Sequence, residues 1–168
     1  LFHKVEEKLT GAPSIIVLDE CWLFFDNEQF ANKIREWLKV LRKKNTGVIF
    51  ATQELGDIMN SKLFTTILDA CLTKIFLPNA NALADNYSVI YKKFGLNSKE
   101  IQIISEATPK KDYYYKSPKG SRLFELVLGQ NTLKLVGAND PEVQKEAKEL
   151  YELVGGGEKF TRNYLSLK

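Results

Sequence analysis

The segment that most constrains the fold of this chain is Ile15-Ile16-Val17-Leu18-Asp19-Glu20, in which four apolar residues run directly into two acids. A continuous apolar run of this length, rich in β-branched residues, predicts a strand that is buried on both faces, as parallel sheets require. Carboxylates at the edge of a buried sheet are costly unless a cation or a reacting group uses them. The alternative is that the acids only make the end of an ordinary α/β strand soluble.

A second apolar run, residues 48–52, follows the strongest helical pattern of the chain, residues 27–44. The apolar stripe of that helix consists of Phe30, Ile34, Leu38 and Leu41. Strand, helix and strand in this order predict a β-α-β unit with parallel strands. Ligand chemistry in such units lies at the carboxyl ends of the strands, where this chain carries Asp19, Glu20 and Gln53.

The two acids are the residue types that phosphoryl-transfer enzymes of the phosphate-loop class need at a strand tip. The Asp, here Asp19, holds the water shell of Mg²⁺, and the neighbouring Glu, here Glu20, polarises the attacking water. Parallel strands lie only about 4.8 Å apart, so the amide of Gln53 can reach the space beside both acids. There it would sense a terminal phosphate or orient the water; the alternative is a simple cap of the strand end.

The remaining patterns predict further helices and strands. Helical patterns, in part interrupted, cover residues 55–70, 80–94, 98–105 and 141–154. The last of these helices has Asp140 as its cap and ends at the glycines of residues 155–157, before a short tail. Strand patterns cover residues 72–77 and a hairpin, residues 112–116 and 122–128, to which residues 132–136 are expected to add a third antiparallel strand.

Length and composition indicate one globular domain. The 168 residues are 44% hydrophobic and 27% charged, which excludes a disordered chain. We expect residues 1–168 to form a single domain, with an α/β core part (1–105), a hairpin region (106–138) and a carboxyl-terminal helix and tail (139–168). No apolar run reaches the roughly 18 residues that would span a bilayer.

Cysteine usage and net charge exclude other kinds of site. Cys21 and Cys71 are too few for a disulfide framework or a metal knuckle, so we expect buried thiols in a reducing compartment. His3 is expected at the surface, without partners for a catalytic triad. Tyrosines 113–115 could stack on nucleic-acid bases and residues 39–44 could track a phosphate backbone, but a net charge of +3 argues against a broad nucleic-acid footprint.

Short motifs are spread in one order over nearly the whole chain. They are Leu18-Asp19-Glu20-Cys21-Trp22, Ile34-Arg35-Glu36-Trp37-Leu38-Lys39, Leu41-Arg42-Lys43-Lys44-Asn45, Ala51-Thr52-Gln53, Ile75-Phe76-Leu77-Pro78-Asn79, Tyr113-Tyr114-Tyr115-Lys116-Ser117-Pro118 and Gly120-Ser121-Arg122-Leu123-Phe124-Glu125-Leu126. Together they resemble the carboxyl-terminal motor domain of the large type IV secretion and conjugation ATPases, the TraC, TrbE and CagE type.

The resemblance implies an α/β fold of the RecA-like P-loop NTPase type. This would be a three-layer core fragment with a mainly parallel sheet, an appended antiparallel hairpin and a carboxyl-terminal helix. The resemblance also implies an ATPase that uses ATP and Mg²⁺ and works as an oligomer, a hexamer or a dimer. It further implies a place in the cytoplasm, peripheral to the bacterial inner membrane, with inner-membrane components of the secretion system as partners in substrate transfer or pilus assembly.

The family's functional residues carry over by motif. Asp19, which would hold the metal through water, and Glu20, which would act as the base, match the second nucleotide motif, and Gln53 matches the glutamine after the sensor strand. The basic positions from which such motors contact nucleotide across a subunit interface are matched by Arg35, Arg42 and Arg122. Each arginine has the alternative of being a solvated or salt-bridged side chain, and geometry decides between the two.

The chain departs from the family in one respect, because it contains no G-x-x-x-x-G-K-[ST] phosphate loop. We expect this loop before residue 1, on a strand between those of residues 48–52 and 72–77. Without the loop the β and γ phosphates have no cradle, so the 168 residues alone are expected neither to hydrolyse ATP nor to hold it tightly. Either these two strands pair directly, or another chain fills the place between them.

Two other functions stay open. Asp19-Glu20-Cys21 resembles the start of the DECH box of helicases, although Trp22 takes its fourth place, so a helicase-like or DNA-translocating RecA-fold ATPase is one alternative. The other is a non-catalytic module that binds secretion partners through the hairpin and the terminal helix. Turnover stimulated by nucleic acid would favour the first, and an unimpaired Glu20→Gln variant would favour the second.

Overall fold

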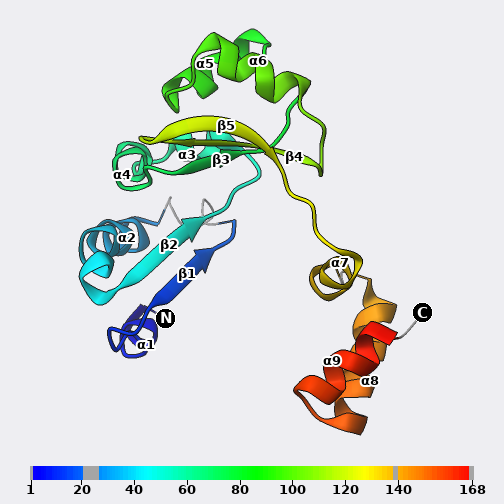
Figure 1. Cartoon of the computed structure of the whole chain (residues 1–168). Helices are drawn as coiled ribbons and strands as arrows, with labels where there is room; N and C mark the ends of the chain where they lie inside the picture. Colours follow the sequence, from blue (N-terminus) through cyan, green and yellow to red (C-terminus); the bar gives the residue numbers. More distant parts are fainter. Residues whose placement is uncertain (1, 21–26, 138–139, 167–168) are drawn as a thin grey trace. The chain divides into compact units, whose positions relative to one another are not determined.

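A computed structural model describes residues 2–20, 27–137 and 140–166 of the chain. The chain divides into two compact units, residues 1–124 and residues 125–168 (Figure 1). Every candidate site residue belongs to the first unit. Our expectation of a single domain over residues 1–168 stays a prediction.

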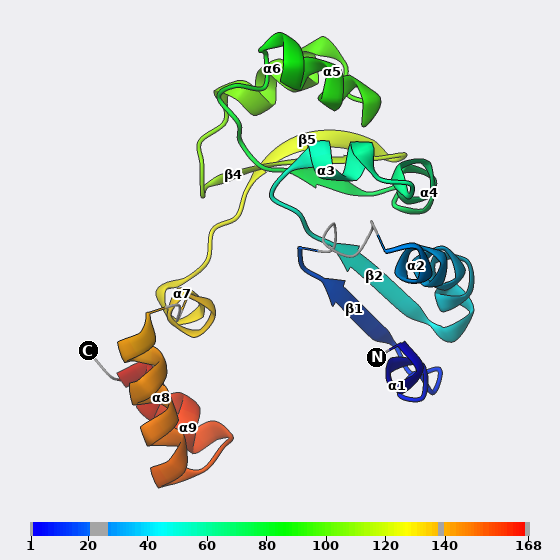
Figure 2. The same cartoon turned by 180° about the vertical axis from the view of Figure 1, so that it is seen from behind.

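The first unit begins with the helix α1 (Phe2–Glu6), and the elements of the predicted β-α-β unit follow it. They are β1 (Ser14–Leu18), α2 (Glu28–Val40), the short 3-10 helix η2 (Leu41–Lys44) and β2 (Thr46–Phe50). β1 and β2 pair in parallel, from Ser14 opposite Thr46 to Leu18 opposite Phe50. In both views α2 lies along this pair of strands (Figures 1 and 2). The β-α-β unit predicted from the sequence is confirmed.

The bounds of α2 follow from its capping residues. The side chain of Asn27 accepts a hydrogen bond from the backbone N–H of Phe30 (3.0 Å), which starts the helix. Asn45 ends η2 with a left-handed backbone (φ 54°), a conformation that Asn tolerates better than most residues. The residues of this segment that are buried are Ala31, Ile34, Trp37 and Leu41. Phe30 and Leu38 pack against them, so the predicted apolar stripe faces the core.

The two faces of the β1–β2 pair differ in exposure. One face packs on the core through Ile16, Leu18, Val48 and Phe50. On the other face Ile15, Val17 and Ile49 are 70%, 61% and 51% exposed. The expectation that the 15–18 strand is buried on both faces is therefore wrong for the described residues, because none of them is laid over this second face.

A second sheet contains β3 (Lys74–Phe76), β4 (Asp112–Ser117) and β5 (Gly120–Glu125), in that order. β3 runs antiparallel to β4, with Phe76 opposite Tyr114. The predicted strand at residues 72–77 and the predicted hairpin are present, but a mainly parallel sheet is not, since β1–β2 is the one parallel pair among the described residues. Direct pairing of β2 with β3 is likewise wrong, because β3 pairs with the hairpin instead.

Four helices of the first unit match predicted helical patterns. They are α3 (Leu55–Asn60), α4 (Phe64–Ala70), α5 (Asp85–Lys93) and α6 (Ser98–Glu106). In both views α5 and α6 lie together on one side of the β3-β4-β5 sheet (Figures 1 and 2). Leu63, Ile101 and Ile104 are fully buried between these elements, in the same core cluster as α2.

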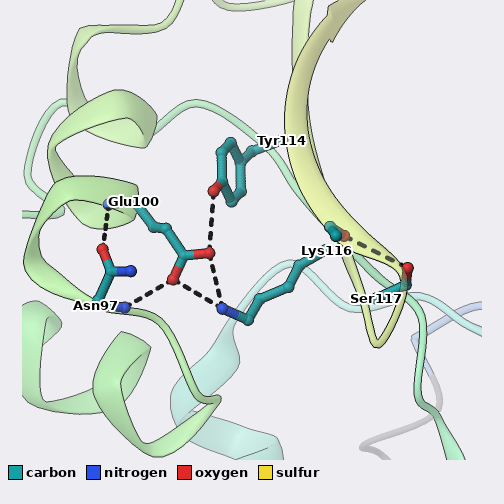
Figure 3. A network of polar contacts seen from close by, with 6 residues as sticks. Asn97, Glu100, Tyr114, Lys116 and Ser117 are labelled. Atoms are coloured by element: carbon teal, nitrogen blue, oxygen red, sulfur yellow. Dashed lines mark hydrogen bonds and ion pairs between the residues drawn. The ribbon is translucent and has the colours of Figure 1, made fainter.

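Glu100 ties the start of α6 to β4 (Figure 3). Its carboxylate accepts hydrogen bonds from the backbone N–H of Asn97 (2.7 Å), from the Tyr114 hydroxyl (3.0 Å) and from Nζ of Lys116 (2.7 Å to each oxygen). Asn97 in turn accepts from the backbone N–H of Glu100 (2.9 Å), which completes a capping box. Burial raises the pKa of Glu100 more than any other single influence, but the bonds from Lys116, Asn97 and Tyr114 together hold that pKa below its ordinary value.

The second unit consists of α7 (Gln130–Val136), α8 (Pro141–Val154) and α9 (Glu158–Ser166). The strand predicted at residues 132–136 is wrong, since α7 occupies them; a short apolar run does not distinguish strand from helix. α8 and its cap are confirmed, because the Asp140 side chain accepts from the backbone N–H of Glu142 (2.8 Å). The expected tail contains α9, whose Tyr164 hydroxyl donates to the carbonyl of Lys134 on α7 (3.2 Å).

Candidate functional site

The carboxyl ends of β1 and β2 leave the sheet at the same edge. The backbone N–H of Ala51 donates to the carbonyl of Leu18 (2.9 Å), so the register continues just past the strands. Beyond this bond, the Nε2 amide of Gln53 donates to Oε1 of Glu20 (2.5 Å). The predicted approach of Gln53 to the acids is therefore present, and the two strands bring an amide and a carboxylate into direct contact.

Glu20 has an unusual backbone at this edge. Its φ is 49°, in the left-handed region that non-glycine residues seldom occupy. The side chain of Asp19 accepts a hydrogen bond from the backbone N–H of Glu20 (3.1 Å), which holds the turn after β1. Such backbone outliers cluster at functional sites, where the surrounding structure maintains them. Asp19 and Glu20 are thus held in a fixed turn, with the Glu20 carboxylate toward Gln53.

A second turn presents Gln53. The Thr52 hydroxyl donates to the carbonyl of Glu54 (3.2 Å) and accepts from the backbone N–H of Glu54 (3.3 Å). A hydroxyl that bonds the backbone two residues onward closes a tight turn, which leaves the intervening side chain at its tip. Gln53 is accordingly exposed. Thr52 was not among the predicted site residues, although a Ser or Thr before a strand-end residue is the signal for such a turn.

A pocket of about 320 Å³ lies beside this turn. Its lining comes from residues 53–56 at the start of α3, from Asn79 after β3, and from Tyr87, Ile90 and Tyr91 of α5. Nδ2 of Asn79 donates to the Tyr91 hydroxyl (3.2 Å), and Oδ1 of Asn79 accepts from the backbone N–H of Asn81 (3.0 Å). The pocket therefore shares Gln53 with the acid edge, which is the carboxyl edge of β1 and β2 that carries Asp19 and Glu20. No sequence pattern indicated this pocket, because its three walls come from distant segments.

Two of the candidate arginines lie on the helical crossover. The guanidinium of Arg35 donates to the Asn32 side chain (2.9 Å) and to the carbonyl of Lys62 (2.7 Å), which links α2 to the segment before α4. Arg42 is exposed on η2, which leads into the amino end of β2. The five-residue strands place that end about 15 Å from the acids. Within one chain Arg42 is thus remote from Asp19 and Glu20.

The third candidate, Arg122, belongs to the hairpin. Its guanidinium carbon lies 5.9 Å from the centre of the Tyr115 ring, at a distance typical of cation–π contacts. β5, which carries Arg122, is in a different sheet from β1 and β2. Among the predicted site residues the structure therefore brings together Asp19, Glu20 and Gln53. No hydrogen bond or ion pair is described between these three residues and the three arginines.

The side chains at the acid edge suit a magnesium ion whose ligands are mostly water molecules. The described residues contain no group of three or more His, Cys, Asp or Glu side chains arranged to hold a metal. Mg²⁺ usually keeps several waters and takes only one or two protein carboxylates, together with substrate phosphates. Asp19, exposed at the tip of β1, is a suitable residue to support such a water shell.

The remaining candidates are not part of this edge. The His3 side chain is 86% exposed, as predicted, and its Nδ1 lies 3.5 Å from a carboxylate oxygen of Glu7. Cys71 is a half-buried free thiol, and burial raises its pKa. Cys21, which was also expected to be a buried thiol, and Trp22 lie outside the described residues.

An α/β unit with carboxylates and an amide at the carboxyl edge of its parallel strands is typical of ligand-binding α/β proteins. The family model of the TraG P-loop domain matches residues 1–121, and the chain belongs to this family. It is 45% identical over 151 residues to a conjugal transfer protein TrbE of Rhizobium radiobacter, covering 90% of this chain. It is 33% identical over 144 residues, 83% of this chain, to a type IV secretion system protein virB4 of Bartonella quintana.

These relatives are much longer than the present chain. The matched region covers 18% of the TrbE protein and 17% of the virB4 protein. It covers 11% of a type IV secretion system protein CagE of Helicobacter pylori, which is 31% identical over 114 residues, 68% of this chain. No helix within the described ranges combines the length and apolar character needed to cross a membrane.

Proposed function

We propose that this chain is the carboxyl-terminal part of a type IV secretion ATPase, in which it supplies the metal-binding and water-activating side of the nucleotide site. The observation that carries the proposal is the hydrogen bond from Gln53 to Glu20 at the carboxyl edge of the parallel strands. The type IV secretion and conjugal transfer relatives support it. Hydrolysis in the intact protein would power substrate transfer or pilus assembly.

Three residues would have distinct roles at this edge. Asp19 would hold the water shell of Mg²⁺, and Glu20 would act as general base toward the attacking water. Gln53 would sense the terminal phosphate or orient that water, since its amide is a neutral donor and acceptor. Bound ATP with Mg²⁺ supplies the phosphoryl group and the charge that neutralises it. The 168 residues contain no G-x-x-x-x-G-K-[ST] motif, so we propose that they are inactive and hold no nucleotide tightly by themselves.

The intact motor would be a RecA-like oligomer, a hexamer or a dimer, peripheral to the bacterial inner membrane on its cytoplasmic side. Its partners would be other copies of itself and inner-membrane components of the secretion system. Arg42 and Arg122 would then reach nucleotide only from a neighbouring subunit, while the bonds of Arg35 to α2 and Lys62 favour a structural role. A binding surface for nucleic acid has less support, given a net charge of +3.

The exposed face of the β1–β2 pair supports a larger core in the intact protein. Parallel sheets are covered on both faces in almost all α/β proteins. Ile15, Val17 and Ile49 together form an apolar face that the described residues leave open. We propose that further secondary structure covers this face and that a strand bearing the phosphate loop lies between β2 and β3, from the same protein or from another chain.

Glu20→Gln in the intact protein tests the motor proposal. The neutral amide keeps the shape of the side chain but removes the base, so turnover of ATP should fall about 100-fold or more while nucleotide binding persists. Steady-state phosphate release and equilibrium binding of a fluorescent ATP analogue measure the two effects. Glu28→Gln, at the exposed start of α2, is the matched control and should leave both unchanged.

The same variant separates the alternatives. Unchanged hydrolysis by Glu20→Gln would contradict the assignment of the base. Lost hydrolysis with unimpaired secretion would favour a non-catalytic interaction module. Strong stimulation of wild-type turnover by DNA would favour a DNA-translocating or helicase-like motor.

A further inference from the structure

β5 is an outer strand of the second sheet, and its edge is accessible. The order of that sheet is β3-β4-β5, and the described residues place no strand beyond β5. An edge strand presents backbone N–H and C=O groups that can pair with a strand of another chain, and proteins often block such an edge with proline. β5 contains no proline, and Leu123 in its middle is 43% exposed. Among the described residues this edge is therefore open to a further strand.

The side chains on one face of the hairpin form two cross-strand pairs. The rings of Tyr113 and Phe124 stack with their centroids 5.6 Å apart, and the Arg122 guanidinium lies over the Tyr115 ring. Alternate residues of a strand share a face, so Arg122 and Phe124 are neighbours on this face of β5, whereas Leu123 lies on the other face. A partner strand beside β5 would thus meet one cation and one aromatic ring, two residues apart.

This spacing is complementary to itself. Two copies of β5 can pair in antiparallel orientation about a two-fold axis, so that the same strand forms both sides of the interface. With Leu123 on the axis, Arg122 of each copy lies opposite Phe124 of the other copy. Each guanidinium would then lie between the Tyr115 ring of its own chain and the Phe124 ring of the second copy. Cation–π attraction would therefore act on both sides of each Arg122.

The two neighbouring registers on the same face are less suitable. An axis at Arg122 would place two guanidinium groups directly opposite each other, and like charges in that position destabilise a pair of strands. An axis at Phe124 would place Arg122 opposite Leu126, which has no ring. Of these three registers, the axis at Leu123 is the one that pairs each cation with a ring.

We propose that two copies of this chain associate through antiparallel pairing of their β5 strands, with Leu123 on the two-fold axis. The three-stranded sheet of each copy would continue into that of the other. This interface goes beyond the proposed motor function, because it includes no nucleotide and no residue of the acid edge. An Arg122 engaged in this way would not reach nucleotide, which leaves Arg42 for that role.

Sedimentation velocity of the 168-residue chain tests the interface. The reference is Val17→Lys, because a charge there opposes association through the exposed face of the β1–β2 pair. A pair of six-residue strands makes an interface below the roughly 1,200 Å² of standard complexes, so the reference should dimerise weakly, with a dissociation constant on the order of 10–100 µM.

The same substitution at the two sides of the sheet locates the interface. Leu123→Lys in the reference background should weaken the dimer at least about 10-fold, because two ammonium groups then lie directly opposite each other. Leu77→Lys is the matched control, since Leu77 is also exposed but follows β3, the outer strand on the other side of the sheet. It should dimerise as the reference does. Circular dichroism establishes that each variant is folded.

Cross-linking tests the register. In a background with Cys21 and Cys71 replaced by serine, Leu123→Cys places two thiols opposite each other on the axis, where a disulfide can form. Oxidised glutathione should convert this variant into a covalent dimer. Ser121→Cys is the control, because the proposed register separates its two thiols by about 13 Å along the strands. It should remain monomeric on a denaturing gel.

The outcomes separate this inference from the proposed motor function. A reference that stays monomeric, or equal dimerisation of folded Leu123→Lys and the reference, would overturn the interface. Equal cross-linking of Leu123→Cys and Ser121→Cys would overturn it as well. None of these results bears on hydrolysis, which Glu20→Gln tests. Dimerisation lost in Leu123→Lys, together with full hydrolysis by Glu20→Gln in the intact protein, would support the interface and contradict the motor assignment.

Discussion

Glu20 combines a strained backbone with a specific side-chain contact. A left-handed conformation costs a non-glycine residue about 1–2 kcal/mol, so a chain retains it where neighbouring bonds enforce it. Two hydrogen bonds hold Glu20 in this conformation. Its backbone N–H donates to the Asp19 side chain, and its carboxylate accepts from the Gln53 amide. The strain therefore supports the proposal that the position of this carboxylate matters more than local stability.

Glu100 provides a pH-dependent contribution to stability. Because its pKa in the folded chain lies below the ordinary value of about 4.3, the stability that it adds is present above that value and is lost as pH falls through the lowered pKa. Glu100→Gln should lower the free energy of unfolding by about 1.5–3 kcal/mol at neutral pH, as it removes the ion pair with Lys116. Urea unfolding monitored by circular dichroism measures this difference.

The difference between wild type and Glu100→Gln should shrink as the pH is lowered from about 6 to about 3, because wild-type Glu100 then becomes protonated as well. Glu106→Gln, at the far end of the same helix, removes a carboxylate that is not bonded to a lysine and is the control. A difference that stays constant over this pH range would contradict the role assigned to Glu100.

At the scale of elements, α2 fixes the position of both strand ends because it is the crossover that joins them. Its amino end depends on the Asn27 cap, which satisfies the N–H of Phe30. Asn27→Ala should therefore destabilise the chain by about 1 kcal/mol, whereas Asn27→Ser should retain most of the stability. The midpoint of urea unfolding at constant slope measures both effects.

Equal stability of Asn27→Ala and wild type would show that the cap contributes nothing and that packing of Ile34 and Trp37 alone starts the helix. A change in the slope of the unfolding transition would instead indicate a different unfolded or native state.

At the scale of the whole molecule, apolar surface exposed on the β1–β2 pair should govern solution behaviour. Contiguous exposed apolar surface promotes association, so the 168-residue chain should self-associate or bind a hydrophobic dye. Val17→Lys, on the exposed face, should reduce both by placing a charge there, with a change in stability of less than about 0.5 kcal/mol. Light scattering after size exclusion measures association.

Ile16→Lys is the matched control on the opposite face of the same strand. Because Ile16 packs on the core, this substitution should destabilise the chain by several kcal/mol instead of improving its behaviour. Equal effects of the two substitutions would contradict the assignment of faces.

Interactions between near neighbours in sequence were predictable. Three features depend on residue types and spacing within a few residues, and the sequence pattern identified them. They are the apolar run before Asp19, the stripe of α2 and the Asp140 cap of α8. The approach of Gln53 to Glu20 was also predictable, because two parallel strands joined by one helix must end at the same edge. The strand predicted at residues 132–136 failed because that segment is short and its apolar spacing is compatible with both a strand and a helix.

By itself the sequence determined the β-α-β unit, the hairpin and the side chains that meet at the carboxyl edge. Only the tertiary structure decided that β3 pairs with β4, that Glu100 bonds to Lys116, and that Asn79 and Tyr87 wall a pocket beside Gln53. It also decided that the described residues leave one face of the parallel pair open. The physical reason is the separation in sequence between the residues that interact. Caps, turns and periodic stripes depend on bonds between nearby residues, whereas strand partners and pocket walls depend on the total burial and hydrogen bonding of segments far apart in the chain.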